Sequence, residues 1–410
     1  MTGVVAVTRP WLNCETADKS SKQLSSECYS GQYSQLYGHR LNTLRKFFST
    51  SSSESSVFVE RIINVTEGIM CTVVGTLVKE MPLRSSGKED NWWSENDTAV
   101  LEDDSGRLEL LFDDDKLQPH PLQNLTTGMV LGMTGVVNSG GVMNVQILRY
   151  PSIPEAPVPA ASTEGESFTV LLSGLEFGNH SDEASRLARE MLLDYLAGYA
   201  SMDEDSKCTK IARIIIVGNS CSGSISCSDG LKEFNLWLGQ ICQGMGIPVD
   251  ILPGKLDPTN ANWPQRPLHP SLLPRLSNLS CHCNPTTLIM NKSTHIAATD
   301  GENIQDILRY VPSKTTELQA MEYSVQCGHV CPTAPDSLSM EPGINDASCF
   351  FTPHAPHIYM AGNCSSFATK TVQNTRLICI PSFQQSHQLV LLSSQHPHSC
   401  QTLTFQPPPS

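Results

Sequence analysis

Hydrophobic residues follow two different spacings along this chain, and the first of them is helical. Between residues 33 and 48, apolar side chains fall on one side of a helix, at Tyr33, Leu36, Tyr37, Leu41, Leu44 and Phe48. Arg40, Arg45 and Lys46 fall mostly on the other side. The pattern predicts an amphipathic helix that packs on its own domain.

Residues 57–153 show the shorter spacing that is typical of β-strands. The run 71–78 is rich in β-branched residues and is interrupted by Gly75. Two turns, 102–106 and 138–141, each separate a pair of short apolar runs and predict hairpins. Five or so short strands with glycine kinks indicate a small barrel of the OB type.

After a proline- and alanine-rich segment at 151–159, predicted strands alternate with predicted helices. The helices are expected from an N-cap at Ser181 to about Gly198, and from Leu231 to Met245. The strands are expected at 168–172, 211–217, 249–252, 358–360, 377–380, 389–392 and 403–405. This alternation indicates a mixed α/β (α+β) fold with a central sheet sandwich flanked by helices.

The same patterns divide the chain into four predicted parts. They are a flexible N-terminus at 1–30, a helix with a serine-rich connection at 31–56, an OB-fold domain at 57–160 and the sandwich domain at 161–406.

Composition narrows the classes of protein that fit. The chain has 410 residues and a net charge of −14, with 41 acidic and 27 basic side chains. Extensive DNA binding needs Lys and Arg to displace counterions from phosphates, so direct contact with DNA is expected to be weak at most. No apolar run approaches the ~20 residues of a membrane span and the N-terminus lacks a signal-peptide pattern, so an intracellular, soluble protein is expected. The fifteen scattered cysteines predict reduced thiols rather than a disulfide framework.

Four predicted strands end in short loops that begin with small residues, at Gly174, Gly218, Gly254 and Gly362. In α/β folds, sites are built at such strand ends. The arrangement resembles the calcineurin-like metallophosphoesterases, whose motifs D-x-H, G-D-x-x-D, G-N-H-[DE] and G-H-x-H hold two metal ions. That chemistry needs a bridging carboxylate, further ligands and a histidine that protonates the leaving oxygen.

At the positions that correspond to those ligands and to that acid, this chain has other residue types: Gly174, Glu176, Asn219, Lys255, Leu256 and Asn363. Gly174 has no ligand atom, and Asn219 removes the bridging negative charge. Lys255 would repel a metal, and Leu256 cannot donate a proton. The resemblance therefore implies an inactivated phosphoesterase domain with no catalytic residue, no metal and no cofactor.

An OB barrel joined to an inactivated phosphoesterase domain is the architecture of the B-subunits of the replicative DNA polymerases alpha, delta and epsilon. The stretches that resemble this family, and its delta branch above all, are 71–77 with 81–83, 100–103, 252–260 with 267–270, 301–310 and 332–338. The D-P-T-N sequence (Asp257, Pro258, Asn260) and the P-T-A-P-D sequence (Pro332, Pro335, Asp336) together are the most specific. The resemblance extends from about Tyr33 to Phe405, although the segments after Asn219 and after Phe367 are shorter than it leads us to expect.

The resemblance implies a nuclear, non-catalytic subunit that acts as a scaffold in DNA replication and repair synthesis. In the family, such a chain binds the cysteine-rich C-terminal module of the catalytic chain. It also holds a third, elongated subunit, which links the assembly to the sliding clamp. Any iron–sulfur or zinc centre would then belong to the catalytic chain.

Several smaller features have a structural and a functional interpretation. Asp257 and Asn260 are expected to bond their own loop backbone rather than a residual metal. Asp306 and Arg309, three residues apart in a predicted helix, form either a local ion pair or a partner contact. Trp92 and Trp93 lie in an acidic loop, which argues against DNA and fits a protein partner or simple loop packing.

The groups Cys281–His282–Cys283 and Cys327–His329–Cys331 lack the paired C-x₂-C spacing of a structural zinc site. Reduced structural cysteines are the favoured interpretation, with a packing or capping role for His329.

Other functions remain open from the sequence alone. They are an active metal-dependent phosphodiesterase or nuclease, an OB module that binds single-stranded DNA, and a B-subunit of polymerase alpha or epsilon.

Overall fold

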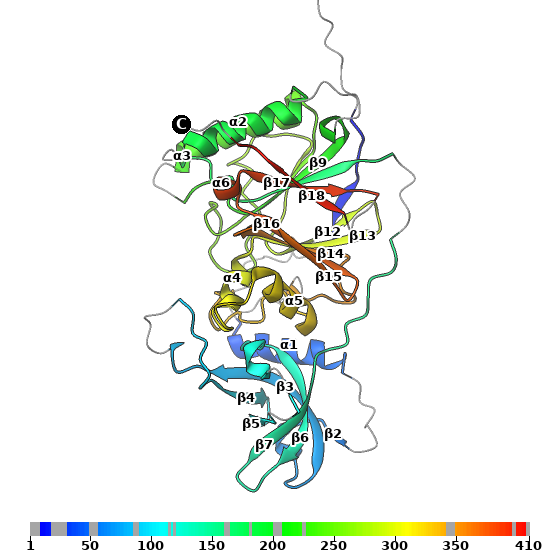
Figure 1. Ribbon diagram of the computed structural model, residues 1–410, viewed down its shortest axis with the longest axis vertical. Coiled ribbons are helices and arrows are strands. Elements are labelled where there is room, and N and C mark those ends of the chain that lie inside the picture. Colours follow the sequence, from blue (N-terminus) through cyan, green and yellow to red (C-terminus); the bar gives the residue numbers. More distant parts are fainter. Residues whose placement is uncertain are drawn as a thin grey trace, which may run out of the picture. The chain divides into compact units, whose positions relative to one another are not determined.

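The computed structural model describes residues 9–17, 31–48, 56–84, 90–113, 116–117, 120–159, 165–179, 183–199, 207–223, 227–341, 349–395 and 399–406. The chain divides into two compact units (Figure 1). Unit 1 consists of Met1–Gln23, Ala156–Glu302 and Pro356–Ser410, and unit 2 consists of Leu24–Glu155 and Asn303–Ala355. None of the helices in the described ranges is both long and apolar enough to cross a membrane.

Unit 2 contains a closed five-stranded barrel, which confirms the predicted OB-type fold. Its strands are β3 (Met70–Glu80), β4 (Thr98–Asp103), β5 (Gly106–Phe112), β7 (Val142–Arg149) and β6 (Val130–Val137), in that order around the barrel, and β6 pairs again with β3. The short strand β2 (Val57–Val59) adds to β3 in parallel. Alternation along β5 buries Leu108 and Leu110 and exposes Glu109 and Leu111, as expected for a strand with one face in the core.

The turn between β4 and β5 shows why the chain reverses there. Asp103 accepts hydrogen bonds from the backbone N–H groups of Ser105 (2.7 Å) and Gly106 (3.1 Å) and from that of Ile62 (2.8 Å). Burial by itself would raise the pKa of Asp103, but these bonds and one from the Ser105 hydroxyl outweigh it and hold the pKa below its usual value.

Helix α1 (Tyr33–Arg45) packs on the barrel through Leu41 and Leu44, as the apolar spacing predicted. Arg40 corrects the prediction, because it is fully buried rather than on the outer side of the helix. Its guanidinium donates a 2.8 Å hydrogen bond to the carbonyl of Pro332, which compensates part of the cost of burying the charge.

The segment 303–355 lies in unit 2, although the sequence analysis grouped it with the sandwich domain. It contributes α4 (Glu302–Leu308) and α5 (Glu317–Cys327). Thr316 and Gln319 form a capping box at the start of α5, and Gly328 ends it in a left-handed conformation with φ of 72°.

A buried lysine connects this segment to the barrel. Lys79 on β3 lies 3.1 Å from Asp97, and both side chains are essentially inaccessible. The Lys79 ammonium also donates to the carbonyls of Leu122 (3.0 Å) and Tyr310 (2.6 Å). Three acceptors therefore satisfy the three N–H groups of one buried ammonium.

Unit 1 is a sandwich of two six-stranded sheets. The first has the order β11 (Leu279–Cys281), β10 (Val249–Leu252), β9 (Ile211–Val217), β8 (Phe168–Leu172), β17 (Gln388–Ser393), β18 (Cys400–Thr404). The second has the order β1 (Cys14–Thr16), β12 (Thr286–Met290), β13 (Thr294–Thr299), β14 (Ile358–Cys364), β16 (Thr375–Pro381), β15 (Ala368–Val372). Side chains such as Ile215, Leu252, Ile296 and Met360 fill the space between the sheets.

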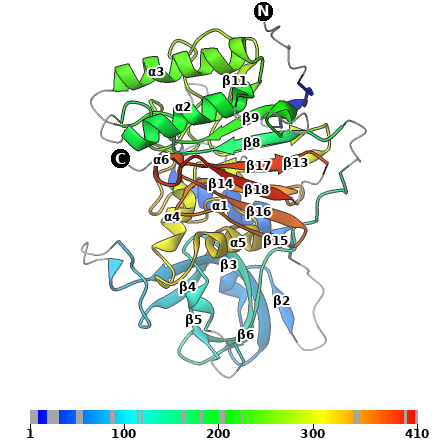
Figure 2. The same ribbon diagram turned by 45° about the horizontal axis from the view of Figure 1, so that its top comes forward.

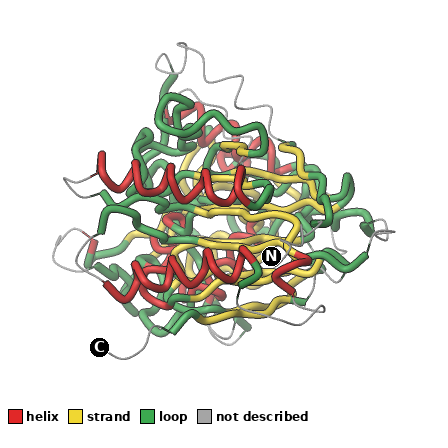
Figure 3. The backbone as a smooth tube through the Cα atoms, turned by 90° about the horizontal axis from the view of Figure 1, so that it is seen from above, coloured by secondary structure: helices red, strands yellow, loops and turns green. Residues whose placement is uncertain are grey.

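Helices α2 (Glu183–Ala197) and α3 (Cys227–Gly239) cover the outer face of the first sheet (Figures 2 and 3). Leu192 and Leu196 of α2 and Phe234 and Leu238 of α3 pack against it. A single π-helical turn, Gln240–Gly244, extends α3. The mixed α/β class and the sheet sandwich are therefore confirmed; the predicted cap Ser181 lies outside the described residues.

Part of the N-terminal segment that we expected to be loose packs on unit 1. Leu12 is buried, and Cys14–Thr16 forms β1 beside β12. Arg213 donates a 3.0 Å hydrogen bond to the Leu12 carbonyl and pairs with Asp250. This anchoring depends on residues some two hundred positions away, which local sequence patterns do not reveal.

Candidate functional site

The loops that end β8, β9 and β10 come together at one edge of unit 1, beside the irregular end of β14. Gly362 and Asn363, which we expected in a loop after a strand 358–360, lie within β14, where its register shifts between Ala361 and Cys364. The backbone N–H of Gly174 donates to the carbonyl of Gly218 (3.0 Å), and that of Glu176 donates to the carbonyl of Asn219 (3.1 Å). Glu176, Asn219 and Asn363 all have positive φ, between 47° and 53°, which non-glycine residues rarely adopt. The structure thus gathers the predicted positions and preserves sharp, irregular loops there.

Gly174 has no space for the aspartate that an active phosphoesterase would have at this position. A Cβ atom on Gly174 would lie 2.8 Å from Asn363 Oδ1 and within contact distance of Ser382 Oγ. The φ of Gly174 is +59°, which adds backbone strain to any side chain placed there. Neighbouring side chains therefore occupy the space that an aspartate side chain would need at this position.

Asn219, Asn363 and Lys255, which we predicted to stand at former ligand positions, contact neighbouring segments of unit 1. Asn219 Oδ1 accepts a 3.0 Å hydrogen bond from the backbone N–H of Leu256. Asn363 Nδ2 donates a 2.8 Å hydrogen bond to the carbonyl of Asp300. The Lys255 side chain is 70% exposed and lies 3.4 Å from Glu302. These groups act as structural hydrogen-bond and charge partners within unit 1.

Glu176 is half-buried at the end of the first of these loops. Burial raises the pKa of its carboxyl group, while Asn179 and Arg189 oppose the shift.

The D-P-T-N turn is internally bonded. The buried Asp257 accepts hydrogen bonds from the backbone N–H groups of Gly254 (2.8 Å) and Cys221 (2.9 Å). Asn260 accepts 2.6 Å from the backbone of Arg266, and Pro258 lies between the two polar residues. Burial raises the pKa of Asp257 to about 6, against the opposing effect of these bonds.

Asp300 is the residue in this region that the sequence analysis missed. It follows β13, is 2% exposed, and accepts 3.2 Å hydrogen bonds from the backbone N–H groups of Lys255 and Glu302. Burial, with Glu302 adding to it, raises its pKa to about 7. An acidic residue directly before a glycine, Gly301, was the signal that could have identified it, although the strand before it has too weak an apolar pattern to be predicted.

The raised pKa of Asp300 predicts a pH dependence of stability. Between about pH 4 and pH 7 the folded chain binds more protons at Asp300 than the unfolded chain, so the free energy of unfolding falls as pH rises. Asp300→Asn should flatten that decline by an amount on the order of a few kcal/mol. This pH dependence of the free energy of unfolding is measured by urea unfolding at pH steps from about 4.5 to about 8, with the fluorescence of tryptophans such as the buried Trp263 as the signal.

Asp194→Asn, on an exposed position of α2, is the matched control and should keep the wild-type slope. If the Asp300→Asn and wild-type curves run parallel over this pH range, the assignment to Asp300 is wrong.

In unit 2, the P-T-A-P-D stretch connects three elements. Pro332 accepts the bond from Arg40, and Pro335 follows a cis peptide bond. Asp336 lies 2.5 Å from Arg84 and accepts a 3.0 Å hydrogen bond from the hydroxyl of Tyr310.

The tryptophan loop packs against the end of α4. Trp92 is 7% exposed, meets Tyr310 edge-on, and has the guanidinium of Arg309 3.7 Å from its ring centroid. Asp306 is buried and accepts a 2.6 Å hydrogen bond from Ser337, with Arg309 at 3.5 Å. Trp93 is half-buried, and the Arg309 side chain is 40% exposed. Of the four residues proposed as partner contacts, Trp93 and Arg309 are therefore the more exposed.

The cysteine groups are spread over both units. No disulfide bond joins the cysteines whose side chains the structure describes, and most of these cysteines are buried. Nδ1 of His329 accepts a 3.2 Å hydrogen bond from the backbone of Cys331. Among the described residues, no group of three or more His, Cys, Asp or Glu side chains is placed to hold a metal ion.

Two protein-family models match the chain. One, described as the B-subunit of DNA polymerase alpha/epsilon, matches residues 169–369. The other, described as DNA polymerase delta subunit OB-fold domain, matches residues 32–148. The first match covers the sandwich strands from β8 to β14 and also the segment 303–355 of unit 2, and the second covers α1 and the barrel of unit 2.

Curated relatives match over nearly their whole length. A DNA polymerase delta small subunit from Oryza sativa subsp. japonica is 30% identical over 93% of this chain and 95% of its own. DNA polymerase delta subunit 2 of Drosophila melanogaster is 29% identical over 90% of this chain and 92% of its own. The DNA polymerase delta small subunit of Saccharomyces cerevisiae is 28% identical over 89% of this chain and 87% of its own.

Solved structures give much weaker likenesses. Vacuolar protein sorting 29 from Cryptosporidium parvum is 10% identical, with a TM-score of 0.31 over 58% of this chain and 97% of that one. A predicted phosphoesterase from Streptococcus pneumoniae is also 10% identical, with a TM-score of 0.26 over 56% and 84%.

Proposed function

Because the chain belongs to the family of DNA polymerase delta small subunits, we propose that it is a non-catalytic scaffold of a polymerase delta assembly. In this proposal it binds the cysteine-rich C-terminal module of the catalytic chain and a third, elongated subunit. The sliding clamp is reached only through that third subunit. The assembly acts in the nucleus, in replication and repair synthesis.

One observation carries the non-catalytic part of the proposal. At the strand ends of unit 1, the positions that would hold metals are used for packing and for hydrogen bonds between loops, as at Gly174 and Asn219. A binuclear site needs a bridging carboxylate and open space for two ions. Asn219 supplies no negative charge, and the region around Gly174 is filled.

The binding part of the proposal rests on the relatives. The name polymerase delta small subunit applies to chains that align with this one over most of their length. Arg309 and Trp93 are proposed as contact residues, because they combine a planar cation or an aromatic ring with remaining exposure.

The catalytic question is tested with the full-length chain, Mn²⁺ and either labelled single-stranded DNA or bis(p-nitrophenyl) phosphate. We expect no turnover above a heat-killed sample, while an active calcineurin-like phosphodiesterase assayed in parallel cleaves the substrate. Turnover that co-elutes with the chain would overturn the non-catalytic assignment.

The scaffold question is tested by co-expression with the polymerase delta catalytic chain from the same organism. Co-purification is expected with the complete catalytic chain and is expected to be lost when its cysteine-rich C-terminal module is deleted. Equal recovery of both forms would remove that module as the binding partner.

A further inference from the structure

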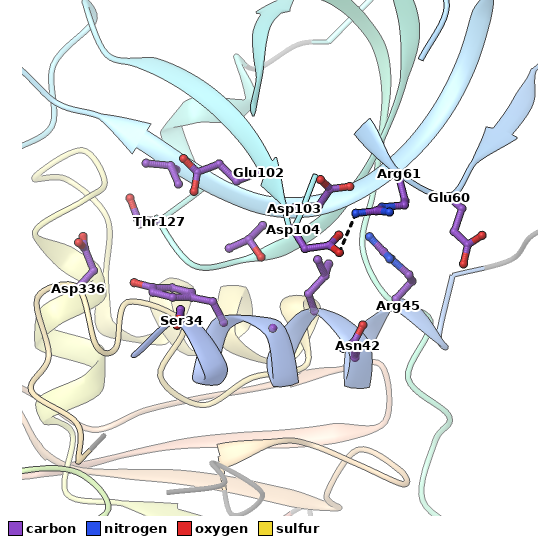
Figure 4. A pocket seen from close by; sticks show the side chains of 15 residues that line it. Ser34, Asn42, Arg45, Glu60, Arg61, Glu102, Asp103, Asp104, Thr127 and Asp336 are labelled. Atoms are coloured by element: carbon purple, nitrogen blue, oxygen red, sulfur yellow. Dashed lines mark hydrogen bonds and ion pairs between the residues drawn. The ribbon is translucent and has the colours of Figure 1, made fainter. Parts of the chain in front are cut away.

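Unit 2 contains two groups of polar side chains that the proposed function does not use. The first lines a groove of about 750 Å³ beside α1 (Figure 4). Most of its carboxylates already have partners in the same unit; Asp104, for example, pairs with Arg61 at 3.1 Å, and Asp103 accepts backbone hydrogen bonds at the β4–β5 turn. The second group consists of three buried cysteines and a buried histidine, which are Cys327, His329, Cys331 and Cys349.

A short antiparallel bridge brings two of these cysteines together. His329 pairs with Phe350 across the bridge, and their rings meet edge-on with centroids 4.8 Å apart. The backbone N–H of Val330 donates a 2.8 Å hydrogen bond to the carbonyl of Cys349. Cys331, the next residue along the chain, therefore lies beside Cys349.

The two thiols are in direct contact with each other and with the imidazole. A side-chain hydrogen bond joins Cys331 to Cys349, and another joins Cys331 to His329. Burial by itself would raise the pKa of the Cys331 thiol, but these bonds and the charges of His329 and Arg40 outweigh it and lower the pKa to about 6. A thiolate is the nucleophilic form of cysteine, so a thiolate beside a second thiol is the arrangement from which a disulfide forms.

Cys327 differs from Cys331, although both are buried. Its thiol can donate to the carbonyl of Ser324 at 3.3 Å or to that of His329 at 3.6 Å, at the C-terminal end of α5. Burial raises the pKa of Cys327 to about 12. Cys327 therefore remains a thiol, and Cys331 is the reactive neighbour of Cys349.

We propose that Cys331 and Cys349 are a thiol modification site, which a hydroperoxide converts reversibly to a disulfide with His329 as the proton carrier. His329 takes the thiol proton of Cys331, and the resulting thiolate attacks one peroxide oxygen. The O–O bond breaks, Cys331 becomes a sulfenic acid, and the leaving hydroxide receives the proton from His329. The sulfur of Cys349 then attacks the Cys331 sulfur, the S–O bond breaks, and the hydroxide leaves with the thiol proton of Cys349 as water. Two thiols thus lose two hydrogens, and one peroxide is reduced to two waters.

Burial of both sulfurs selects the kind of oxidant. Cys331 and Cys349 are each 0% exposed, so hydrogen peroxide, which is close to water in size, fits better than a bulky disulfide such as glutathione disulfide. The new bond closes a loop over residues 332–348, which includes the P-T-A-P-D stretch. Oxidation therefore fixes that stretch to the residues that follow it.

The test treats the full reduced chain with hydrogen peroxide and a parallel sample with glutathione disulfide. Remaining thiols are blocked after denaturation, and the chain is cleaved before aspartates. This cleavage puts Cys331 and Cys349 on separate peptides, because Asp336 and Asp346 lie between them. Mass spectrometry without reductant should find the two peptides joined after peroxide and separate after glutathione disulfide. They should separate again when the peroxide-treated chain is reduced with dithiothreitol.

Two variants and a matched control assign the roles. Cys349→Ser should remove the joined peptides and leave Cys331 as a sulfenic acid that dimedone labels. Cys71→Ser changes another buried cysteine of the same unit and should keep the wild-type yield of the disulfide. His329→Asn keeps an acceptor for the backbone N–H of Cys331, which donates 3.2 Å to Nδ1, but it cannot take up a proton. It should slow the oxidation by about tenfold or more.

Three results would overturn the proposal. In the first, peroxide oxidises the half-buried Cys14 or Cys400 while Cys331 and Cys349 remain thiols. In the second, Cys331 is joined to Cys327 instead. In the third, glutathione disulfide joins the two peptides as readily as peroxide does. An unchanged rate in His329→Asn would remove the role of the histidine. None of these results bears on the scaffold proposal, because the test needs no partner chain.

Discussion

Replacing Gly174 with aspartate should destabilise unit 1 rather than begin to rebuild a metal site. The new Cβ would meet Asn363 Oδ1 at 2.8 Å and would overlap the hydroxyl of Ser382. The backbone at this position has a φ of +59°, which costs a non-glycine residue about 1–3 kcal/mol. Overpacking adds about 1–3 kcal/mol, so the free energy of unfolding should fall by about 2–6 kcal/mol in total.

Gly198→Asp separates the two causes. Gly198 also has a positive φ, +88°, but nothing lies within 4 Å of the place that its Cβ would take. The free energy of unfolding of Gly198→Asp should therefore fall only by the cost of the backbone conformation, about 1–3 kcal/mol. Both variants are measured by urea unfolding with and without Mn²⁺. If Mn²⁺ stabilises Gly174→Asp more than the wild type, the frame still accepts a metal and the interpretation of a filled site is wrong.

The sequence predicted a secondary-structure element correctly where the element forms a continuous apolar run. The strands 168–172, 211–217 and 249–252 were predicted with the bounds that the structure has. Strands β12 and β13 were not predicted, because threonine, alanine and histidine dilute their pattern, as in Thr294–Thr299. Their burial comes from the facing sheet, which a local pattern does not contain.

The candidate site was predictable as a set of strand ends, but not as a set of contacts. The motif resemblance selected Gly174, Asn219 and Asn363 as positions where ligands are replaced, and the structure brings the segments that carry them together. That Asn219 bonds the backbone of Leu256 could not be predicted, because it depends on the relative placement of two loops. Asp300 was missed for the same reason, since its burial arises from segments far apart in the sequence.

The buried pair of Lys79 and Asp97 should be among the most sensitive positions of unit 2. Asp97→Asn leaves the Lys79 ammonium buried with two carbonyl acceptors, Leu122 and Tyr310, and no countercharge. Removing one partner of a buried ion pair typically costs about 3–5 kcal/mol. Asp104→Asn, which breaks an exposed pair with Arg61 in the same unit, should cost less than about 1 kcal/mol.

The pH dependence identifies the lysine as the cause of that loss. Burial already lowers the pKa of Lys79 to about 8, and Asp97 opposes the shift. Between about pH 8 and pH 10 the unfolded chain therefore binds more protons at this lysine than the folded chain, and stability rises with pH. Without Asp97 the pKa of Lys79 falls further, so the rise begins at lower pH and is larger. Urea unfolding of Asp97→Asn should thus show partial recovery, relative to wild type, from about pH 7 to about pH 9.

Lys79→Met combined with Asp97→Asn should lack this recovery and lose less stability than the sum of the losses in the two single variants. A pH-independent deficit in Asp97→Asn would instead assign the loss to packing.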